Sequence, residues 1–262
     1  MSIHIINTKN SLRNYNYLIA CDKTYKAAVI DPLKADACLK LAHDHGYEIE
    51  LIINTHEHWD HIGGNNEILA NTNAKILAHY KAKNKIENIS QTLHGGEIID
   101  IGTSIKLKVL DTPGHTMANV CLLLSSISET DALFSGDTLF NAGCGNCYNG
   151  GCPQAMYQSF KTKLFPLKKN TRIYPGHDYM ENNLKFALSR EPDNENIKQL
   201  LGKLKEKKEI VITTIEQEKK INPFFRLQEK SIINKLIAEG RIVLNATEEE
   251  IFVGLRNCRN EW

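Results

Sequence analysis

The chain has 262 residues, with 32 Lys and Arg against 31 Asp and Glu, so its formal net charge is +1. This length allows one large domain or a domain with a smaller appendage, and the balanced charge argues against non-specific binding to nucleic acid or to a membrane surface. No apolar stretch reaches membrane-spanning length, the N-terminus lacks the regions of a signal peptide, and the seven cysteines fit free thiols in a reducing compartment, so we expect a cytoplasmic protein.

The first part of the chain alternates predicted strands with a predicted helix. Apolar residues recur at helical spacing from Ala35 to His45, and Gly46 follows where a helix C-terminus favours glycine. Strand, helix and strand in this order predict a layered structure of helices on sheets, with a site at strand ends. Strands are predicted at residues 3–7, 16–20, 26–30 and 48–54.

The middle of the chain continues this pattern after a polar interruption. The lysine-rich segment 81–88 is interpreted as a solvated surface. Apolar and polar residues then alternate from Glu97 to Asp111, which predicts a half-buried hairpin. Further predicted elements are a short helix at 65–71 and strands at 74–79, 119–124 and 132–134.

The most informative stretch directly follows a predicted strand and reads Thr55-His56-Glu57-His58-Trp59-Asp60-His61. Residues i and i+2 of an extended segment point the same way, so His56 and His58 can bind one ion together. The following turn places Asp60 and His61 on another side, where they can bind a second ion. Imidazole nitrogen and carboxylate oxygen are ligands of zinc-like metals. The preceding strand favours a metal site over a solvated histidine-rich turn.

Three more candidate ligands also lie at the ends of predicted strands. His115 and His177 each close a Pro-Gly-His turn, where functional residues concentrate. Asp137 follows a strand too, although Gly-Asp is a common turn and is weak evidence by itself. Because the same arrangement repeats, we expect these residues to converge on one site. Glu57 should point away from its histidine neighbours and be solvated.

A loop rich in Gly and Asn, residues 141–152, follows the predicted strand at 132–134. Because it contains few apolar residues, we expect it at the surface, with glycines that let backbone N–H groups approach a ligand. Cys144 and Cys147 form a Cys-x-x-Cys pair. A structural metal or redox pair is the less favoured interpretation, because no second cysteine pair follows at zinc-finger spacing. A helix is predicted from Pro153.

Beyond Tyr179 the strand patterns end and helical patterns rich in Lys and Glu begin. We therefore predict two domains, residues 1–175 and residues 176–262. Apolar residues such as Phe224 and Phe225 favour a packed helical domain over a solubilising tail. Helices are predicted at 181–190, 194–208, 214–221, 230–239 and 247–258.

Together these motifs resemble the metallo-β-lactamase superfamily, whose metal motifs appear here in the family's order. The phrases Trp59–Asn65, Gly136–Phe140, Tyr174–Tyr179 and Asn222-Pro223-Phe224 are similar to those of its glyoxalase II branch, the hydroxyacylglutathione hydrolases. The resemblance covers nearly the whole chain. It implies an α+β fold, an αββα metallo-β-lactamase sandwich with a small helical C-terminal domain that binds substrate.

The resemblance also implies a function and a ligand scheme. A binuclear thioesterase of this family hydrolyses S-lactoylglutathione and related 2-hydroxyacyl thioesters to glutathione and a 2-hydroxy acid, as in methylglyoxal detoxification. The nucleophile is a metal-bound hydroxide, supported by His56, His58 and Asp60. The metals are zinc, iron or manganese, of which we expect zinc. One metal is assigned to His56, His58 and His115 and the other to Asp60, His61 and His177, with Asp137 between them.

On the substrate side the resemblance is less complete. Tyr148 and Tyr179 resemble the family's two glutathione-contacting tyrosines, and Arg256 and Arg259 resemble the cations that hold the glycine carboxylate. Asn146 stands where the family usually has lysine. Two further departures are Cys147, which replaces an aromatic residue, and Arg259, which replaces a lysine. Cys144 is also assigned to the pocket.

Other functions remain as alternatives. Because the predicted pocket is altered, a thioesterase that acts on thioesters of a different thiol is one alternative. Persulfide dioxygenases and nucleases of the same superfamily are two others. The full ligand set argues against a persulfide dioxygenase, and the absence of an inserted domain or a basic surface argues against a nuclease. A metal-binding or glutathione-sensing protein without turnover is a different class. We expect a monomer with a small glutathione thioester as its partner.

Overall fold

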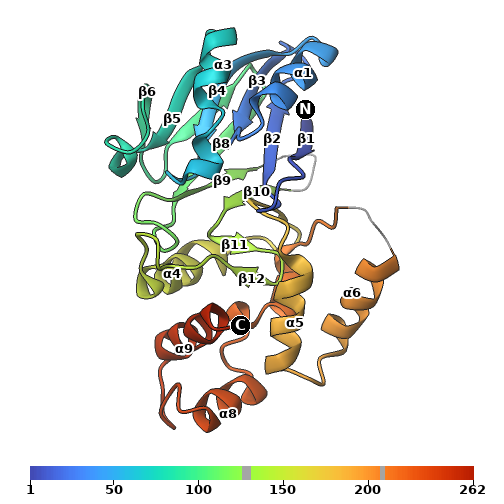
Figure 1. Ribbon diagram of the computed structural model, residues 1–262, viewed down its shortest axis with the longest axis vertical. Helices are drawn as coiled ribbons and strands as arrows, with labels where there is room; N and C mark the ends of the chain where they lie inside the picture. Colours follow the sequence, from blue (N-terminus) through green and yellow to red (C-terminus); the bar gives the residue numbers. More distant parts are fainter. Residues whose placement is uncertain (126–130, 207–209) are drawn as a thin grey trace.

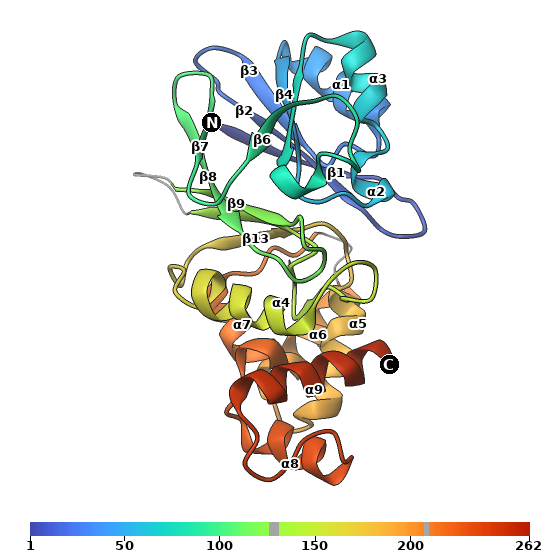
Figure 2. The ribbon, with the colours of Figure 1, turned by 90° about the vertical axis from the view of Figure 1, so that its left-hand side faces the viewer.

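The computed structural model describes residues 1–125, 131–206 and 210–262. Two β-sheets lie face to face, and further helices gather at one end of the molecule (Figure 1, Figure 2). Helices α1 (Ala35–His45) and α3 (Asn65–Asn71) pack on the first sheet, whereas α4 (Pro153–Ser159) packs on the second. This arrangement confirms the predicted α+β fold and αββα sandwich.

The strands are arranged so that several of them end at one edge of the sandwich. In the first sheet β3 to β6 pair in parallel, and in the second sheet β10 pairs in parallel with β13. The first sheet has the order β1 (Ser2–Asn7), β2 (Tyr15–Ala20), β3 (Lys26–Ile30), β4 (Glu48–Asn54), β5 (Lys75–His79) and β6 (Ile89–Leu93). The second has the order β13 (Arg172–Pro175), β10 (Ala132–Gly136), β9 (Val120–Leu124), β8 (Ile105–Asp111) and β7 (Ile98–Ile101).

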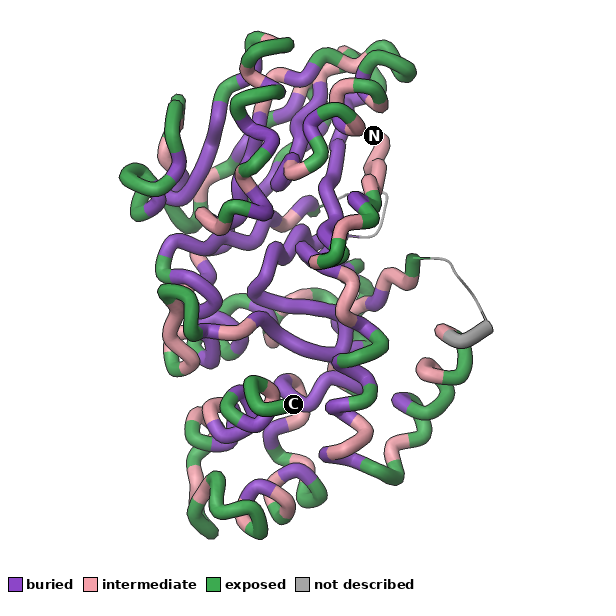
Figure 3. The backbone as a smooth tube through the Cα atoms, viewed as in Figure 1, coloured by how far each residue is buried: buried purple, intermediate pink, exposed green. Residues whose placement is uncertain are grey.

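Alternation along buried strands builds the two cores. On β2, Tyr17 and Ile19 face the second sheet, whereas Leu18 and Ala20 face the helices on the outer side. The Tyr17 hydroxyl also donates a hydrogen bond to the Pro175 carbonyl at 2.6 Å, which ties the two sheets together near the end of β13. Figure 3 shows this buried backbone continuing through both sheets.

The C-terminal helices form a further layer beside the second sheet. Helix α9 (Glu248–Asn260) begins with a capping box between Thr247 and Glu250 and contacts α4. Phe252 packs between Phe160 and Phe224, so the helical part shares a core with the sandwich. The other helices are α5 (Met180–Arg190), α6 (Glu195–Glu206), α7 (Ile215–Ile221) and α8 (Lys230–Ala238). Residues 207 and 208, the end of the helix predicted at 194–208, lie outside the described residues.

Two predicted surface segments are buried in part. The loop predicted at 141–152 starts within a hairpin of β11 (Leu139–Phe140) and β12 (Gly143–Cys144), and the C-terminal helices cover it. Burial is possible because side chains from those helices satisfy its backbone polar groups: Asn222 donates to the Gly143 carbonyl, and Glu218 accepts from the Ala142 N–H. The segment 81–88 is not wholly solvated either, since Ala82 and Ile86 are buried and precede strand β6.

Among the described residues, no helix combines the length and the apolar character needed to cross a membrane.

Candidate metal centre and substrate pocket

All seven predicted metal ligands lie in turns at strand ends. Four of them follow β4, in the turn that becomes the short helix α2 (Trp59–Ile62). The others follow β8, β10 and β13, which bring His115, Asp137 and His177 to the same place. The first sheet therefore contributes one half of the centre and the second sheet contributes the other half.

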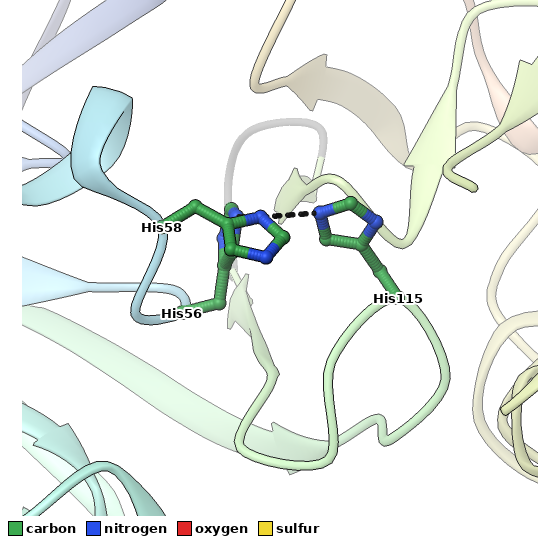
Figure 4. Close-up of side chains that lie close together, drawn as sticks. All are labelled: His56, His58 and His115. Carbon is green, nitrogen blue, oxygen red and sulfur yellow. Dashed lines mark hydrogen bonds between the residues drawn. The ribbon is translucent and has the colours of Figure 1, made fainter. Parts of the chain in front are cut away.

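The first group of ligands is the set of imidazoles His56, His58 and His115 (Figure 4). His58 Nδ1 lies 3.1 Å from His56 Nε2 and 3.0 Å from His115 Nε2. On the opposite side of the His58 and His115 rings lies a backbone oxygen: the Asn149 carbonyl 3.1 Å from His58 Nε2 and the Asn146 carbonyl 2.7 Å from His115 Nδ1. Donation to these carbonyls leaves the converging nitrogens with free lone pairs, as a metal requires.

The second group is Asp60, His61 and His177. The Nε2 atoms of the two histidines are 3.2 Å apart, and Asp60 Oδ2 lies 3.5 Å from His61 Nε2 and 3.4 Å from His177 Nε2. The outer nitrogen of His177 donates to the Leu12 carbonyl at 2.8 Å. These three side chains again turn their free donor atoms toward one point.

Asp137 lies between the two groups. Its Oδ2 is 3.5 Å from His115 Nε2 and 3.2 Å from His177 Nε2, and its Oδ1 is 3.5 Å from His61 Nε2. Across residues 1–125, 131–206 and 210–262, no group donates a hydrogen bond to this buried Oδ1. A buried carboxylate oxygen without a donor fits a position between two cations.

The electrostatics of the centre also favour cations. Burial raises the pKa of Asp137, but His177 and His61 outweigh it and hold that pKa well below its usual range. Burial lowers the pKa of His61, whereas Asp137 and Asp31 outweigh it and raise the pKa to about 9. In contrast, burial lowers the pKa of His56 and of His115, which keeps both rings neutral. The neutral rings of His56 and His115 and the ionised Asp137 are ready to bind a divalent metal, whereas His61 has to release its proton when a metal binds.

Asp31 and Asn14 support the centre, although we did not predict a role for either residue from the sequence. Asp31 Oδ2 accepts from the Thr55 hydroxyl at 2.7 Å and from His61 Nδ1 at 2.9 Å, so it orients a ligand while its own lone pairs are occupied. Asn14 Nδ2 donates to Asp60 Oδ2 at 2.9 Å. Asp31 could have been found, because it directly follows β3, the parallel neighbour of β4; nothing in the sequence marks Asn14.

Glu57 differs from its prediction. Its side chain is only 6% exposed, forms an ion pair with Lys85 and accepts a hydrogen bond from the Thr116 hydroxyl at 2.8 Å. It does point away from the histidines, but it packs beside the turn of His115 instead of facing solvent. The charge of Lys85 makes this partial burial possible.

A cavity of about 380 Å³ adjoins the second ligand group. The Tyr179 ring stacks on His177, with centroids 4.9 Å apart, and connects the cavity to the centre. Arg256 is buried, and its Nη1 donates to the carbonyls of Cys144 and Gly145, each at 2.9 Å. Arg259 donates to the neutral Asn183 side chain at 3.2 Å. All six predicted substrate-binding residues line this cavity: Cys144, Asn146, Tyr148, Tyr179, Arg256 and Arg259.

The comparisons with known proteins agree with this geometry. The sequence model described as the metallo-beta-lactamase superfamily matches residues 17–177, and the one described as the hydroxyacylglutathione hydrolase C-terminus matches residues 178–262. Among solved structures, ETHE1 from Myxococcus xanthus superposes with a TM-score of 0.70 at 24% identity, covering 98% of this chain and 91% of that one. TTHA1623 in a di-iron-bound form gives 0.60 at 22% identity, covering 84% and 99%. Fold and ligand groups therefore define a metallo-β-lactamase superfamily protein.

Relatives in sequence narrow the class. A protein of Nitrosococcus oceani named hydroxyacylglutathione hydrolase is 48% identical over the full length of both chains. One of Arabidopsis thaliana, named cytoplasmic hydroxyacylglutathione hydrolase, is 34% identical over 95% of each chain. The chain belongs to the hydroxyacylglutathione hydrolase family.

Proposed function

We propose that this protein is a thioesterase that hydrolyses S-2-hydroxyacylglutathione, S-lactoylglutathione among them, to glutathione and a 2-hydroxy acid such as lactate. The observation that carries the proposal is that the arginine-lined cavity adjoins the two ligand groups, which Asp137 joins. A thioester whose carbonyl lies at the ligand groups can extend its peptide portion into that cavity. The names and the full-length identity of the relatives support the same reaction.

Two divalent metal ions, for which we propose zinc, are required at the centre. One ion would be held by His56, His58 and His115 and the other by Asp60, His61 and His177, with Asp137 shared. Such a pair supplies Lewis acidity and a water nucleophile whose pKa falls toward about 7.

The residues of the chain bind and orient the substrate. In the proposal Tyr148 and Tyr179 contact the peptide portion, and Arg256 and Arg259 attract its glycine carboxylate. Cys144 and Asn146 contribute the wall between those arginines and the ligand groups. A thiolate is a good leaving group, so no strong general acid is needed.

The test combines thioester hydrolysis with metal analysis. The His58→Ala variant should fold, lose bound metal and lose at least about a hundredfold in turnover, because it removes a ligand. The His43→Ala variant, which removes an exposed imidazole from α1, should keep both. Hydrolysis of S-lactoylglutathione at the full rate by a metal-free preparation would falsify the proposal. Thioesters of other thiols, run in parallel, test the choice of glutathione.

Three further predictions stand beside this proposal. We propose that the protein acts in the cytoplasm and as a monomer, and that residues 1–175 and 176–262 form its metal-binding and substrate-binding domains. Cell fractionation tests the first and light scattering the second, and limited proteolysis of the full chain tests the boundary between the two domains.

A further inference from the structure

Arg13 is held rigidly beside the metal centre. Its backbone is left-handed, with φ at 58°, and is fixed on both sides: its N–H donates to the Asn10 carbonyl and its carbonyl accepts from the Asp178 N–H. The next residue, Asn14, donates to the metal-facing oxygen of Asp60. Hydrogen bonds therefore hold the backbone from which the Arg13 side chain extends.

The guanidinium group of Arg13 lies at the cavity and is free of carboxylates. It is exposed, lines the cavity and lies over the Tyr179 ring at 5.8 Å from the centroid. Within the parts of the chain that the structure describes, no Asp or Glu forms an ion pair with it, and the Asp178 carboxylate interacts with Tyr15 instead. Its five donors are available to a ligand.

The cavity as a whole has an excess of positive charge. Arg13, Arg256 and Arg259 line it, and none of its other lining residues is acidic. Burial lowers the pKa of Arg259, and the charge of Arg256 lowers it further. Within the described residues, the two arginines donate to backbone carbonyls and to the neutral side chains of Asn260 and Asn183. One carboxylate placed against Arg256 and Arg259 would still leave Arg13, which lies over the Tyr179 ring, without an anion.

A ligand with two carboxylates matches these three cations. Glutathione has one at its glycine end and one on its γ-glutamyl residue, with the thiol between them. We propose that Arg13 is a specificity-determining residue that pairs with the γ-glutamyl carboxylate, while Arg259 and Arg256 face the glycine carboxylate. This inference rests on the proposed function, and a bidentate arginine–carboxylate pair supplies the selectivity.

The kinetic test uses three substrates: the lactoyl thioesters of glutathione, of γ-glutamylcysteine and of cysteinylglycine. The Arg13→Gln variant should raise KM about tenfold for the first two and leave the third unchanged, since only the third lacks the γ-glutamyl carboxylate. The Arg13→Lys variant should recover part of the loss, because it keeps the charge without the fork geometry. As the matched control, Arg172→Gln removes an exposed arginine from β13 and should alter none of the three.

The outcomes are decisive in both directions. An equal rise in KM for all three thioesters would mean that Arg13 acts only by packing on Tyr179, and no rise at all would mean that it touches no substrate; either result overturns the inference. If the unmodified protein hydrolyses none of the thioesters, the proposed function fails, and the role of Arg13 is then decided by binding.

Trp262 supplies that binding measurement, because it lines the same cavity. The chain has two tryptophans, so a Trp59→Phe background leaves Trp262 as the only indole. In this background glutathione should change the fluorescence, and Arg13→Gln should weaken the fitted affinity about tenfold for glutathione but not for cysteinylglycine. Equal affinities for glutathione with and without Arg13 would contradict the inference even in a protein without turnover.

Discussion

At the scale of single residues, the centre depends on the outer atoms of its histidines as much as on their inner ones. His58 and His115 donate to backbone carbonyls of the 146–149 segment, and His177 donates to the carbonyl of Leu12. His61 differs from these three rings, because its outer nitrogen donates to a carboxylate, that of Asp31. An ionised partner makes an imidazole a stronger ligand than a carbonyl does, so Asp31 should influence the metal more than the carbonyls do.

The Asp31→Asn variant tests this supporting role. We expect metal affinity to fall about 10-fold to 100-fold, because an amide cannot accept from both the Thr55 hydroxyl and His61 with the strength of a carboxylate. Turnover should fall at limiting metal and return toward the original rate with excess metal. Competition with a chelator of known affinity measures the change.

The matched control is Asp36→Asn, an exposed acid on α1. It removes the same charge a short distance along the chain without touching a ligand. If both variants bind metal as tightly as the unmodified protein, Asp31 does not orient His61 in the way its hydrogen bonds suggest.

At the scale of elements, the β11–β12 hairpin depends on α7 for its place. Glu218 on α7 is fully buried and accepts from the Ala142 N–H, from the Thr213 hydroxyl at 2.6 Å and from Asn222 Nδ2 at 2.7 Å. Ala142 itself is left-handed, with φ at 59°, so this hydrogen bond stabilises a strained position. The carboxyl group thus fixes the wall of the cavity that contains Cys144.

Glu218 should give the protein a measurable pH dependence of stability. Burial raises its pKa to about 7 from a usual value of 4.5, despite the three donors that lower it. The folded state therefore binds more protons than the unfolded state between these values, and the contribution of Glu218 to stability falls as pH rises from about 5 to about 7. It becomes constant about one pH unit above the folded-state pKa. Over the complete transition the change is about 3 kcal/mol.

The Glu218→Gln variant removes this titration. We expect the unfolding free energy of the unmodified protein, relative to the variant, to decrease by about 2 kcal/mol between pH 5 and pH 7 in denaturant titrations. The Glu216→Gln control changes an exposed glutamate on the same helix and should show no such slope. A difference that stays constant between pH 5 and pH 7 would mean that Glu218 is ionised throughout this range in the folded protein and would contradict the prediction.

At the scale of the whole molecule, sequence periodicity predicted a layered order of strands and helices because periodicity is local, and the resemblance to the superfamily supplied the sandwich. The strand 48–54 and the helices at 35–45 and 65–71 match to the residue. Burial of residues 141–147 was not predictable in this way. It depends on Glu218, Asn222 and Arg256, which are 70 or more positions away in sequence and satisfy that segment's backbone groups. The metal ligands could be placed from strand ends, whereas Asn14 and Arg13 lie in a loop without periodicity.

The centre also joins the two sheets, which leads to a prediction for metal removal. Ligands after β4 belong to the first sheet, and those after β8, β10 and β13 belong to the second. Metal that binds only the folded state stabilises it by about 4 kcal/mol at a thousand times Kd. For a chain of this size that corresponds to about 10 °C in Tm. Chelation should therefore lower Tm by about 10 °C in calorimetry, and added zinc should restore it. The His58→Ala variant, which lacks a metal ligand, should already have a Tm near that of the chelated protein and should change little when chelator is added. The His43→Ala variant should respond like the unmodified protein. An unchanged Tm after verified metal loss would show that packing between the sheets, with Tyr17 and its bond to Pro175, suffices without the ions.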